Sequence, residues 1–256
     1  MIVDVVIPTF QETERLFRAV DSALNQTVPV DNIFVVDGGS NEEITYSMRR
    51  HFEGQARVHL VFMSYTGLPG VGREKGIRLS KADWVAFLDA DDVWEPTKIE
   101  QQLAFAEATQ SRFVCTNARK LKGGVSQGSY FLEGSVPKRL TSRDLVADNK
   151  VITSSVMADR ELLMEVGVFA STPHVRAVED YATWLRCISI TSFSYIDTPL
   201  VDYEISELGL SAGSVMDARI FAISDFLVWL KTTALIDKKT SKRLRTIALK
   251  QLKSRF

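Results

Sequence analysis

The chain contains too little cysteine for a covalently or zinc-stabilised scaffold. Only Cys115 and Cys187 occur among 256 residues, far apart and each in an apolar stretch. This arrangement gives neither the spacing of a zinc cluster nor a disulfide framework. We therefore expect two buried thiols that pack as small hydrophobic side chains in a reducing compartment, so a cytoplasmic location is predicted.

Long hydrophobic runs and an excess of basic charge are missing as well. No 18 consecutive residues are apolar, and Asp4 and Pro8 interrupt the amino-terminal segment in which a secretory signal needs an unbroken apolar core. We expect neither a cleaved signal nor a membrane-spanning helix. With 31 Lys and Arg against 32 Asp and Glu, the formal net charge is −1, which argues against nucleic acid as a partner.

The first 110 residues indicate an α/β fold. Apolar runs rich in β-branched residues alternate there with segments whose apolar residues recur at helical spacing, which is typical of a mostly parallel sheet flanked by helices. The predicted strands are 2–7, 33–36, 58–63 and 84–88. Helices are predicted at 12–24, 72–80 and 97–109. A further helix begins after Ser40 or Asn41, either of which can cap it, and Glu43 is placed to form a capping box with Ser40.

After residue 110 the pattern is more varied, although the length and a hydrophobic content of 45% still favour one domain. Glycines 123, 124 and 128 predict a hairpin or loop, Asp159 caps a helix that Gly167 ends, and the chain from Asp217 onward is helical. The other predicted elements are strands at 113–116, 151–157, 194–196 and 200–205, and helices at 142–148, 160–166 and 179–190.

Three predicted strands end in polar or glycine-rich turns, at 8–12, 37–40 and 89–92. The carboxyl ends of parallel strands meet at one edge of the sheet, so these turns predict a single nucleotide pocket in which Asp37 accepts from a base or ribose. The glycines of the second turn have an alternative explanation, which is that they only make the turn tight.

The third turn carries three carboxylates, Asp89, Asp91 and Asp92, directly after a buried strand. Their mutual repulsion and their hard oxygen ligands suit Mg²⁺ or Mn²⁺ bound together with substrate phosphates. The alternative is a solvated acidic turn in which Asp92 or Thr97 caps the following helix.

The segments VVIPTFQE (5–12), VVDGGS (35–40), GREKGI (72–77), FLDADDVW (87–94) and EDYATWLR (179–186) resemble, in order and spacing, the motifs of family 2 glycosyltransferases. The resemblance implies a GT-A fold and an inverting enzyme. It implies a Rossmann-like nucleotide-sugar-binding half at 1–110 and a mixed-sheet acceptor half at 111–215, which together form one domain, followed by a helical, basic extension at 216–256.

The same resemblance implies roles for individual residues. Asp89 and Asp91 match the Asp-x-Asp pair that holds the metal, Asp89 lying also toward the ribose, and Asp180 matches the general base. The positions that match substrate-binding residues are Pro8, Thr9, Glu12, Asp37, Arg73, Asp89, Glu179 and Trp184, with Arg73 expected to reach the base or the phosphates. For Asp180, the alternative is an acid placed only by the helix dipole.

The sequence also departs from the family pattern. Gly38 and Glu74 stand where an acid and an asparagine are common, and Tyr203 is followed by Glu204-Ile-Ser instead of Arg-x-His. His174 is one candidate to replace the missing histidine. The hydroxyls of 153–155 match the strand under the donor sugar, where they either bond sugar oxygens or serve as ordinary strand residues.

The carboxyl-terminal segment 238–256 carries eight Lys or Arg and no acid. Its apolar residues Leu244, Ile247, Ala248 and Leu252 approximate one helical face. Such a helix suits an anionic membrane surface, in particular the inner face of the cytoplasmic membrane, or packs on its own domain or on a partner subunit.

These observations predict a metal-dependent glycosyltransferase. It would move a sugar from a nucleoside diphosphate, UDP in the first instance, to a hydroxyl of a glycan or lipid-linked glycan in bacterial surface polysaccharide or lipopolysaccharide synthesis. Two alternatives stay open. One is a sugar-1-phosphate nucleotidyltransferase, for which the expected glycine-rich loop after the first strand is missing, and the other is a non-catalytic nucleotide-sugar binder.

Overall fold

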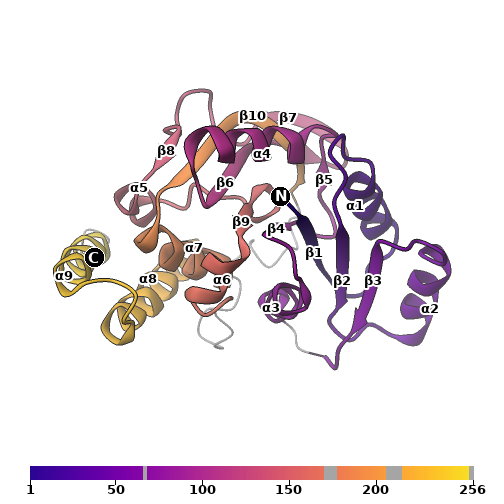
Figure 1. Ribbon diagram of the computed structural model, residues 1–256, viewed down its shortest axis with the longest axis horizontal. Coiled ribbons are helices and arrows are strands. Elements are labelled where there is room, and N and C mark those ends of the chain that lie inside the picture. Colours follow the sequence, from indigo (N-terminus) through magenta and orange to yellow (C-terminus); the bar gives the residue numbers. More distant parts are fainter. Residues whose placement is uncertain (66–67, 170–177, 206–214, 254–256) are drawn as a thin grey trace.

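The computed structural model describes residues 1–65, 68–169, 178–205 and 215–253, and within these ranges ten strands form one mixed sheet (Figure 1). The main path of the sheet has the strand order β3-β2-β1-β4-β9-β6-β10-β5. Helices α1, α2 and α4 supply apolar residues to one face of the sheet, whereas α3, α6 and α7 cover the other. The α/β class and the GT-A arrangement predicted from the sequence are confirmed.

The first half of the chain forms the parallel part of the sheet, in which each pair among β3, β2, β1 and β4 runs in the same direction. The strands are β1 (Val3–Thr9), β2 (Asn32–Asp37), β3 (Val58–Phe62) and β4 (Trp84–Phe87), and the connecting helices are α1 (Glu14–Leu24), α2 (Glu42–His51) and α3 (Pro69–Leu79). Because the strands are parallel, their carboxyl ends and the turns that follow lie along one edge.

The second half adds antiparallel strands to the same sheet. Strand β9 (Met157–Asp159) lies antiparallel between β4 and β6 (Phe113–Lys122), and β10 (Phe193–Glu204) runs parallel to β6. The remaining strands are β5 (Val93–Trp94), β7 (Val125–Ser129) and β8 (Arg139–Leu140), all antiparallel to their partners. The sheet therefore continues across residue 110, where the sequence suggested a division into two halves.

One predicted strand is wrong. Residues 151–157 form a 3₁₀ turn, η1 (Thr153–Ser155), followed by the short strand β9. Ser155 donates both its amide and its hydroxyl to the carbonyl of Ile152, at 2.9 and 2.7 Å. Local bonds of this kind compete with a strand ladder, so a buried run that contains three hydroxyl residues turns instead of extending.

Two other predicted boundaries change. The strands predicted at 194–196 and 200–205 are the single strand β10, whose register against β6 shifts on both sides of Pro199. Helix α2 is capped by Asn41, whose side chain accepts from the amide of Ile44 at 2.9 Å, so the capping box predicted for Ser40 is wrong. Asp159 caps α6 (Arg160–Glu165) as predicted, by accepting from the amide of Leu162 at 2.8 Å.

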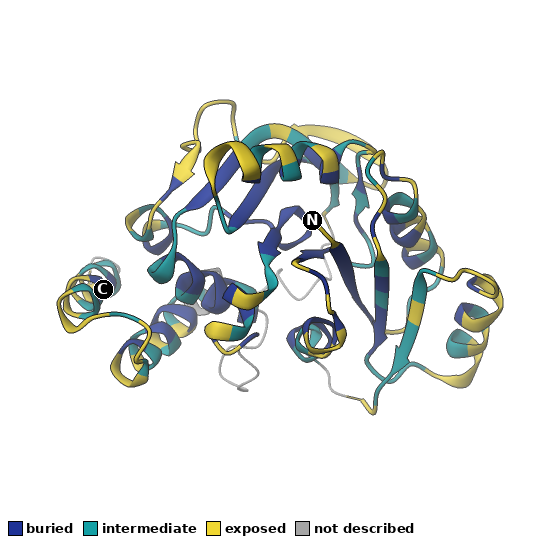
Figure 2. Ribbon diagram, in the orientation of Figure 1, coloured by how far each residue is buried: buried dark blue, intermediate teal, exposed yellow. Residues whose placement is uncertain are grey.

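The core lies on both faces of the sheet. Along β1, Val3, Val5 and Ile7 join one cluster of buried side chains and Val6 joins the other, as expected of a strand covered on both sides. Figure 2 shows this buried sheet between helices whose outer faces are exposed. The two cysteines are free and buried as predicted, and burial raises the pKa of Cys115 to about 12.

The carboxyl-terminal helices belong to the same core. Helix α8 (Val215–Thr232) packs on α7 (Glu179–Ile190), and α9 (Lys238–Lys253) packs on α8 and on α5 (Ser142–Ala147). The segment predicted to be helical from Asp217 onward forms these two helices, α8 and α9. The chain turns between them, where Asp237 accepts from the amides of Lys239 and Thr240 at 2.8 and 2.9 Å.

The apolar face predicted for α9 is turned toward the protein. Leu244 and Ala248 are fully buried, while Ile247 and Leu252 are partly buried against the core. The alternative of a terminal helix that packs on its own domain therefore describes this face. In the described ranges, no helix combines the length and the hydropathy that crossing a bilayer requires.

Helix α3 approaches β1 closely because of a glycine. A Cβ atom at Gly76 would lie 2.4 and 2.6 Å from the two methyl groups of Val6, which is closer than real contacts allow. This contact packs the second half of α3 directly on the middle of β1. The glycine therefore fixes the depth at which the polar residues of α3 reach the sheet.

We expect Gly76→Ala to lower the free energy of unfolding by about 1–2 kcal/mol. Overpacking costs about 1–3 kcal/mol, whereas alanine in a helix gains up to about 1 kcal/mol over glycine. In a Val6→Ala background the clash disappears, so the same change should become neutral or stabilising. A double-mutant cycle by urea unfolding measures this change of sign, and additive effects would contradict the packing argument.

Candidate active site

The three turns predicted to form one pocket lie together at the carboxyl edge of the parallel strands. Thr9 and Asp37 are neighbours in the register of β1 and β2, and the amide of Gly38 donates to the carbonyl of Thr9 at 2.8 Å. The amide of Gln11 donates to the hydroxyl of Ser40 at 2.7 Å, which ties the first two turns to each other. The third turn, 89–92, follows the neighbouring strand β4.

Asp37 shapes the second turn. Its buried carboxylate accepts from the amides of Gly39 and Ser40 at 3.2 and 2.9 Å and from the hydroxyl of Ser40 at 2.5 Å. Gly39 has a φ of +100°, and a Cβ atom there would lie 2.6 Å from the amide nitrogen of Tyr65. At Gly39 the explanation that the glycine makes the turn tight is therefore sufficient.

The first turn offers a buried hydroxyl. Thr9 is almost fully buried, and its Oγ1 atom has no hydrogen-bond partner among the described residues. Pro8 is buried within β1, and Glu12 forms an ion pair with Arg15 one helical turn further on. A buried hydroxyl without such a partner at the carboxyl end of a strand is free to bond a ligand.

An aromatic pair beside this turn was missed in the sequence analysis. The rings of Phe10 and Tyr65 lie 5.3 Å apart between centroids, and both side chains are about half exposed or more, at 48% and 67%. Phe10 follows Thr9 directly, so an exposed aromatic residue in the first turn was the available signal. Tyr65 comes from the loop after β3, and nothing in the local sequence pairs it with Phe10.

Arg73 lies at the junction of the two halves of the chain. It is 5% exposed and donates to Asp89 at 2.6 Å and to Glu179 at 3.4 Å. Burial alone would lower the pKa of Arg73, but the carboxylates of Asp89, Glu179 and Asp180 together raise it above its usual value. The resemblance implied that Arg73 reaches the base or phosphates, and that role stays a prediction. Two of its nitrogens bond carboxylates of the protein.

Glu179 is the buried partner of Arg73 on α7. Its Oε1 atom also accepts from the amide of Gly70 at 3.2 Å, while Oε2 is buried without a hydrogen-bond partner among the described residues. Burial raises the pKa of Glu179, and the charge of Asp180 adds to this, although Arg73 opposes it. Glu179 therefore joins the amino-terminal turns of α3 and α7.

The three carboxylates of the acidic turn have different surroundings. Asp89 pairs with Arg73, whereas Asp92 is 1% exposed and accepts from the hydroxyl of Ser154 at 2.5 Å and from the amide of Glu204 at 3.0 Å. Asp91 accepts no hydrogen bond from another residue in the described part of the chain and faces a pocket. Burial and the charge of Asp89 raise the pKa of Asp91.

The alternative of a solvated turn that caps the following helix is wrong. Asp92 is buried and holds the turn in place without capping a helix. Thr97 occupies the cap position of α4 (Lys98–Thr109), but its side chain accepts from Gln101 at 2.9 Å and makes no capping bond to a backbone amide. Burial and then the charges of Asp89 and Asp91 raise the pKa of Asp92 well above its usual value. In the described ranges, no three His, Cys, Asp or Glu side chains converge as a metal cluster, so a bound ion would take part of its coordination from elsewhere.

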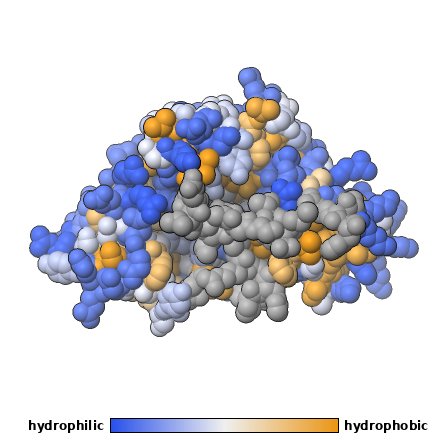
Figure 3. Space-filling view, turned by 180° about the vertical axis from the view of Figure 1, so that it is seen from behind, coloured by the Kyte–Doolittle hydropathy of each residue, from blue (hydrophilic) through white to orange (hydrophobic). Residues whose placement is uncertain are grey.

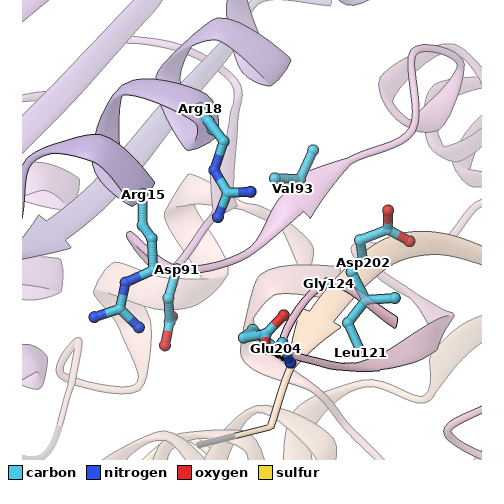
Figure 4. Close-up of a pocket in the computed structure, with 9 residues that line it drawn as sticks. Arg15, Arg18, Asp91, Val93, Leu121, Gly124, Asp202 and Glu204 are labelled. Atoms are coloured by element: carbon cyan, nitrogen blue, oxygen red, sulfur yellow. Dashed lines mark hydrogen bonds between the residues drawn. The ribbon is translucent and has the colours of Figure 1, made fainter. Parts of the chain in front are cut away.

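The pocket beside Asp91 has a volume of about 320 Å³ (Figure 4). One wall comes from α1, the opposite wall from the hairpin of β6 and β7 and from the end of β10. The lining residues are Arg15, Arg18, Asp91, Val93, Leu121, Gly123, Gly124, Asp202 and Glu204. The pocket combines cationic and anionic groups, which suits a ligand that contains both phosphate and hydroxyl groups.

The 3₁₀ turn η1 connects the acidic turn to the predicted base. The hydroxyl of Thr153 donates to Oδ2 of Asp180 at 2.7 Å. The next residue, Ser154, donates its hydroxyl to Asp92 and accepts from the amide of Asp89 at 3.0 Å. These hydroxyls were left open between sugar contacts and ordinary strand residues; the structure gives them a third task, which is to hold carboxylates of the site.

Asp180 lies in the first turn of α7 and is partly exposed. Its second oxygen accepts from the amide of Tyr181 at 2.6 Å, so both carboxylate oxygens have fixed partners. Trp184, one turn further on, does not line the site. Its side chain is completely buried among Phe87, Phe113 and Phe169, because α7 turns this face toward the sheet.

The segment that replaces the family's Tyr-Arg-x-His contacts the acidic turn through its backbone. The amide of Glu204 donates to Asp92, and the Glu204 side chain accepts from the amide of Gly123 at 2.5 Å. His174 and Ser206 lie outside the described residues, so the candidate replacement for the histidine is not placed.

Solved structures with the same architecture are known. The crystal structure of S. aureus TarS 1–349 superposes with a TM-score of 0.75 over 99% of this chain and 72% of that chain, at 15% sequence identity. The crystal structure of the same protein in complex with UDP-GlcNAc gives a TM-score of 0.73 at 14% identity, covering 99% and 73% of the two chains. The fold defines the class of the chain as a GT-A protein.

The sequence comparisons define the family. The description Glycosyl transferase family 2 matches residues 4–163, more than half of the chain. The chain therefore belongs to the family 2 glycosyltransferases, as the resemblance of its motifs implied, and it is a glycosyltransferase, not a sugar-1-phosphate nucleotidyltransferase.

Two curated relatives match most of the chain. The putative teichuronic acid biosynthesis glycosyltransferase TuaG of Bacillus subtilis (strain 168) is 25% identical over 219 residues, 85% of this chain and 84% of the relative. The Escherichia coli UDP-Glc:alpha-D-GlcNAc-diphosphoundecaprenol beta-1,3-glucosyltransferase WfaP is 26% identical over 188 residues, 73% of this chain and 70% of the relative.

A buried lysine contacts two side chains that hydrogen-bond to η1. Lys98 is fully buried on α4, donates to Oε1 of Gln102 at 2.7 Å and lies 3.9 Å above the ring of Trp94. Gln102 in turn donates to the carbonyl of Ser155 at 2.9 Å, and the indole of Trp94 donates to the carbonyl of Ser154 at 2.8 Å. Burial lowers the pKa of Lys98 well below its usual value.

The unfolding free energy of the native chain, measured relative to Lys98→Met, should therefore rise with pH. The folded state holds Lys98 with a lowered pKa, whereas the unfolded state has a value near about 10.4, so the unfolded state binds more protons between these two values. Denaturant unfolding across this pH range measures the difference.

Lys81→Met, at an exposed lysine, is the control and should show no such trend. A difference between the native chain and Lys98→Met that stays constant with pH would contradict a lowered pKa of Lys98 in the folded protein.

Proposed function

We propose that this chain is an inverting glycosyltransferase of cell-surface glycan synthesis. It transfers one sugar from a nucleoside diphosphate to a hydroxyl of a glycan or lipid-linked glycan. The observation that carries the proposal is η1, because one turn holds the carboxylate of Asp180 through Thr153 and two parts of the acidic turn through Ser154. The group that would accept a proton and the group that would face the leaving diphosphate are thus positioned together.

The proposed donor is a UDP-sugar. TarS has been crystallised with UDP and with UDP-GlcNAc, and WfaP is named for a UDP-glucose donor. In this chain the hydroxyl of Thr9, which has no partner among the described residues, and the exposed rings of Phe10 and Tyr65 lie at the edge where a nucleotide base would bind. Flat aromatic faces and one buried polar atom suit a pyrimidine, which stacks and accepts a hydrogen bond.

The proposed cofactor is Mn²⁺ or Mg²⁺. Asp91 faces the pocket without a protein donor among the described residues, and Asp89 uses only Oδ1 for Arg73, so these two residues would hold the ion. Such ions commonly take one or two carboxylates and complete their shell with phosphate oxygens and water. When bound, the ion would stabilise the negative charge that develops on the leaving diphosphate.

Asp180 is the proposed general base. An acceptor hydroxyl near neutral pH is a poor nucleophile, and a carboxylate that takes its proton while the new bond forms is worth about 10²- to 10⁴-fold in rate. The hydrogen bond from Thr153 fixes one oxygen of Asp180 and leaves its remaining lone pairs for the acceptor. Attack from the side opposite the diphosphate inverts the configuration at the anomeric carbon.

The acceptor is proposed from the relatives. TuaG is named for teichuronic acid biosynthesis, and WfaP is named for a glycan carried on diphosphoundecaprenol. A lipid-carried acceptor of this kind would place the chain at the inner face of the cytoplasmic membrane, as a peripheral protein. The exposed basic residues of the carboxyl-terminal helices support this location.

Asp180→Asn should reduce sugar transfer by about 10²- to 10⁴-fold while the affinity for UDP stays unchanged, because the amide cannot accept the proton. Thr153→Val, which keeps the shape but removes the hydroxyl, should lose about tenfold or more in kcat. Release of UDP from a panel of UDP-sugars, with and without acceptor saccharides, measures transfer, and thermal shift measures binding.

The matched control is Asp21→Asn, at an exposed residue of α1, which should behave as the native chain. Unaltered turnover in Asp180→Asn would remove Asp180 from the mechanism. Donor binding by the native chain without turnover on any acceptor would instead support the non-catalytic binder.

Asp91→Asn should weaken the apparent affinity for Mn²⁺ at least about tenfold, because one charged ligand of the ion is lost. The readout is the increase in melting temperature that UDP gives with Mn²⁺ over UDP with a chelator. Asp202→Asn is the control, since Asp202 also lines the pocket but pairs with Arg119. Equal stabilisation by UDP with and without the ion would contradict metal binding.

A further inference from the structure

A second cavity lies between the last two helices, away from the pocket beside Asp91. It has a volume of about 580 Å³ and is formed by the end of α8, the turn at 233–237 and one face of α9. Its lining residues are Leu230, Lys231, Thr233, Ile236, Lys238, Ser241, Lys242, Arg245, Thr246 and Leu249. We refer to these residues as the α8–α9 groove.

The groove concentrates positive charge. Four of its lining residues, Lys231, Lys238, Lys242 and Arg245, are basic and none is acidic. None of the four forms a salt bridge with a residue in the ranges that the structure describes. Lys238, Lys242 and Arg245 follow one another at the spacing of successive helical turns, so they line one side of α9. Charge of one sign, held on two helices without internal neutralisation, is complementary to an anion.

The groove is also partly apolar. Leu230 is buried at its base, Ile236 is partly buried and Leu249 is 44% exposed. Leu235, in the adjoining turn, is 45% exposed as well. A soluble polyanion needs only the cations, whereas an amphiphile with an anionic head and acyl chains uses both kinds of surface.

The position of the groove agrees with a surface contact. Helices α8 and α9 form one end of the long axis of the molecule, and α2 lies at the other end (Figure 1). Hydrophilic residues cover both ends in the view from behind (Figure 3). Because Leu244 and Ala248 on a neighbouring face of α9 are buried in the core, α9 presents the groove without leaving the domain.

We propose that the α8–α9 groove binds the phosphate headgroup of an anionic membrane lipid and so holds the enzyme on the membrane surface. The biological setting rests on the proposed function, but the contact itself depends only on the groove. The basic residues pair with the lipid phosphate while Leu249 and Leu235 reach the acyl region at the edge of the headgroups. This differs from insertion of the apolar face of α9, which the core already occupies.

The test compares two triple variants of the full chain. In the groove variant, Lys238→Gln, Lys242→Gln and Arg245→Gln remove three cations that line the groove. Binding to vesicles of phosphatidylglycerol and phosphatidylcholine, measured by sedimentation, should fall about 100-fold, because each basic residue near an anionic surface contributes somewhat less than a factor of ten. Vesicles of phosphatidylcholine alone should not bind the native chain.

The control variant loses the same charge on another face of α9. Lys239, Arg243 and Lys250 are exposed and do not line the groove, so Lys239→Gln, Arg243→Gln and Lys250→Gln should weaken vesicle binding at least about tenfold less than the groove variant does. Equal losses of binding in the two variants would show diffuse attraction by the basic helix and overturn the proposal. Failure of the native chain to bind the anionic vesicles would overturn it as well.

Two further measurements separate this proposal from its neighbours. Leu249→Asn should weaken binding to vesicles but not to soluble polyphosphate. Equal losses of binding to both would identify a soluble polyanion site and overturn the lipid proposal. Binding of the native chain to polyphosphate but not to vesicles would do the same. UDP-sugar turnover should be the same in both triple variants. Loss of vesicle binding with intact turnover supports the groove, whereas absent turnover with intact vesicle binding contradicts only the proposed function.

Discussion

The hydrogen bonds made by Thr153 and Ser154 are the constraint on which the site depends. Thr153 of the 3₁₀ turn bonds the carboxylate of Asp180. Ser154 bonds the side chain of Asp92 and the backbone amide of Asp89 in the acidic turn that follows β4. The 3₁₀ turn is itself held from below by Trp94 and Gln102. A buried turn with satisfied polar groups is rigid, so the separation between Asp180 and the acidic turn is set by these local hydrogen bonds.

Much of the fold was accessible from the sequence because periodicity reports burial directly. The four parallel strands and the helices up to residue 109, the helix 179–190 and the cap at Asp159 follow from local patterns, whereas the short strand β5 was not predicted. What failed was decided by tertiary contacts. Residues 151–157 have the composition of a strand, but their hydroxyls bond a nearby carbonyl and two carboxylates, and Trp184 faces an aromatic cluster that no local pattern specifies.

The site shows the same division. Residue types at strand ends predicted where polar groups would gather, but not which of these groups would pair with each other. Arg73 was expected to face the ligand, and its partners Asp89 and Glu179, 16 and 106 positions away in the chain, are known only once the two halves are assembled. The spacing of the three aspartates likewise did not reveal that Asp92 would be buried against Ser154 while Asp91 stays at the surface of the pocket.

The crowding of carboxyl groups around Arg73 has a consequence for the order of events. Asp89, Asp91, Asp92, Glu179 and Asp180 interact electrostatically, set against the buried Arg73 and the exposed Arg15. For the proposed donor, a diphosphate already complexed with a divalent cation would be repelled less by these carboxylates than a bare diphosphate. If the proposed function holds, these carboxylates would favour the cation complex of the nucleotide over the free nucleotide before any sugar is recognised, and cation concentration would become part of the substrate selectivity.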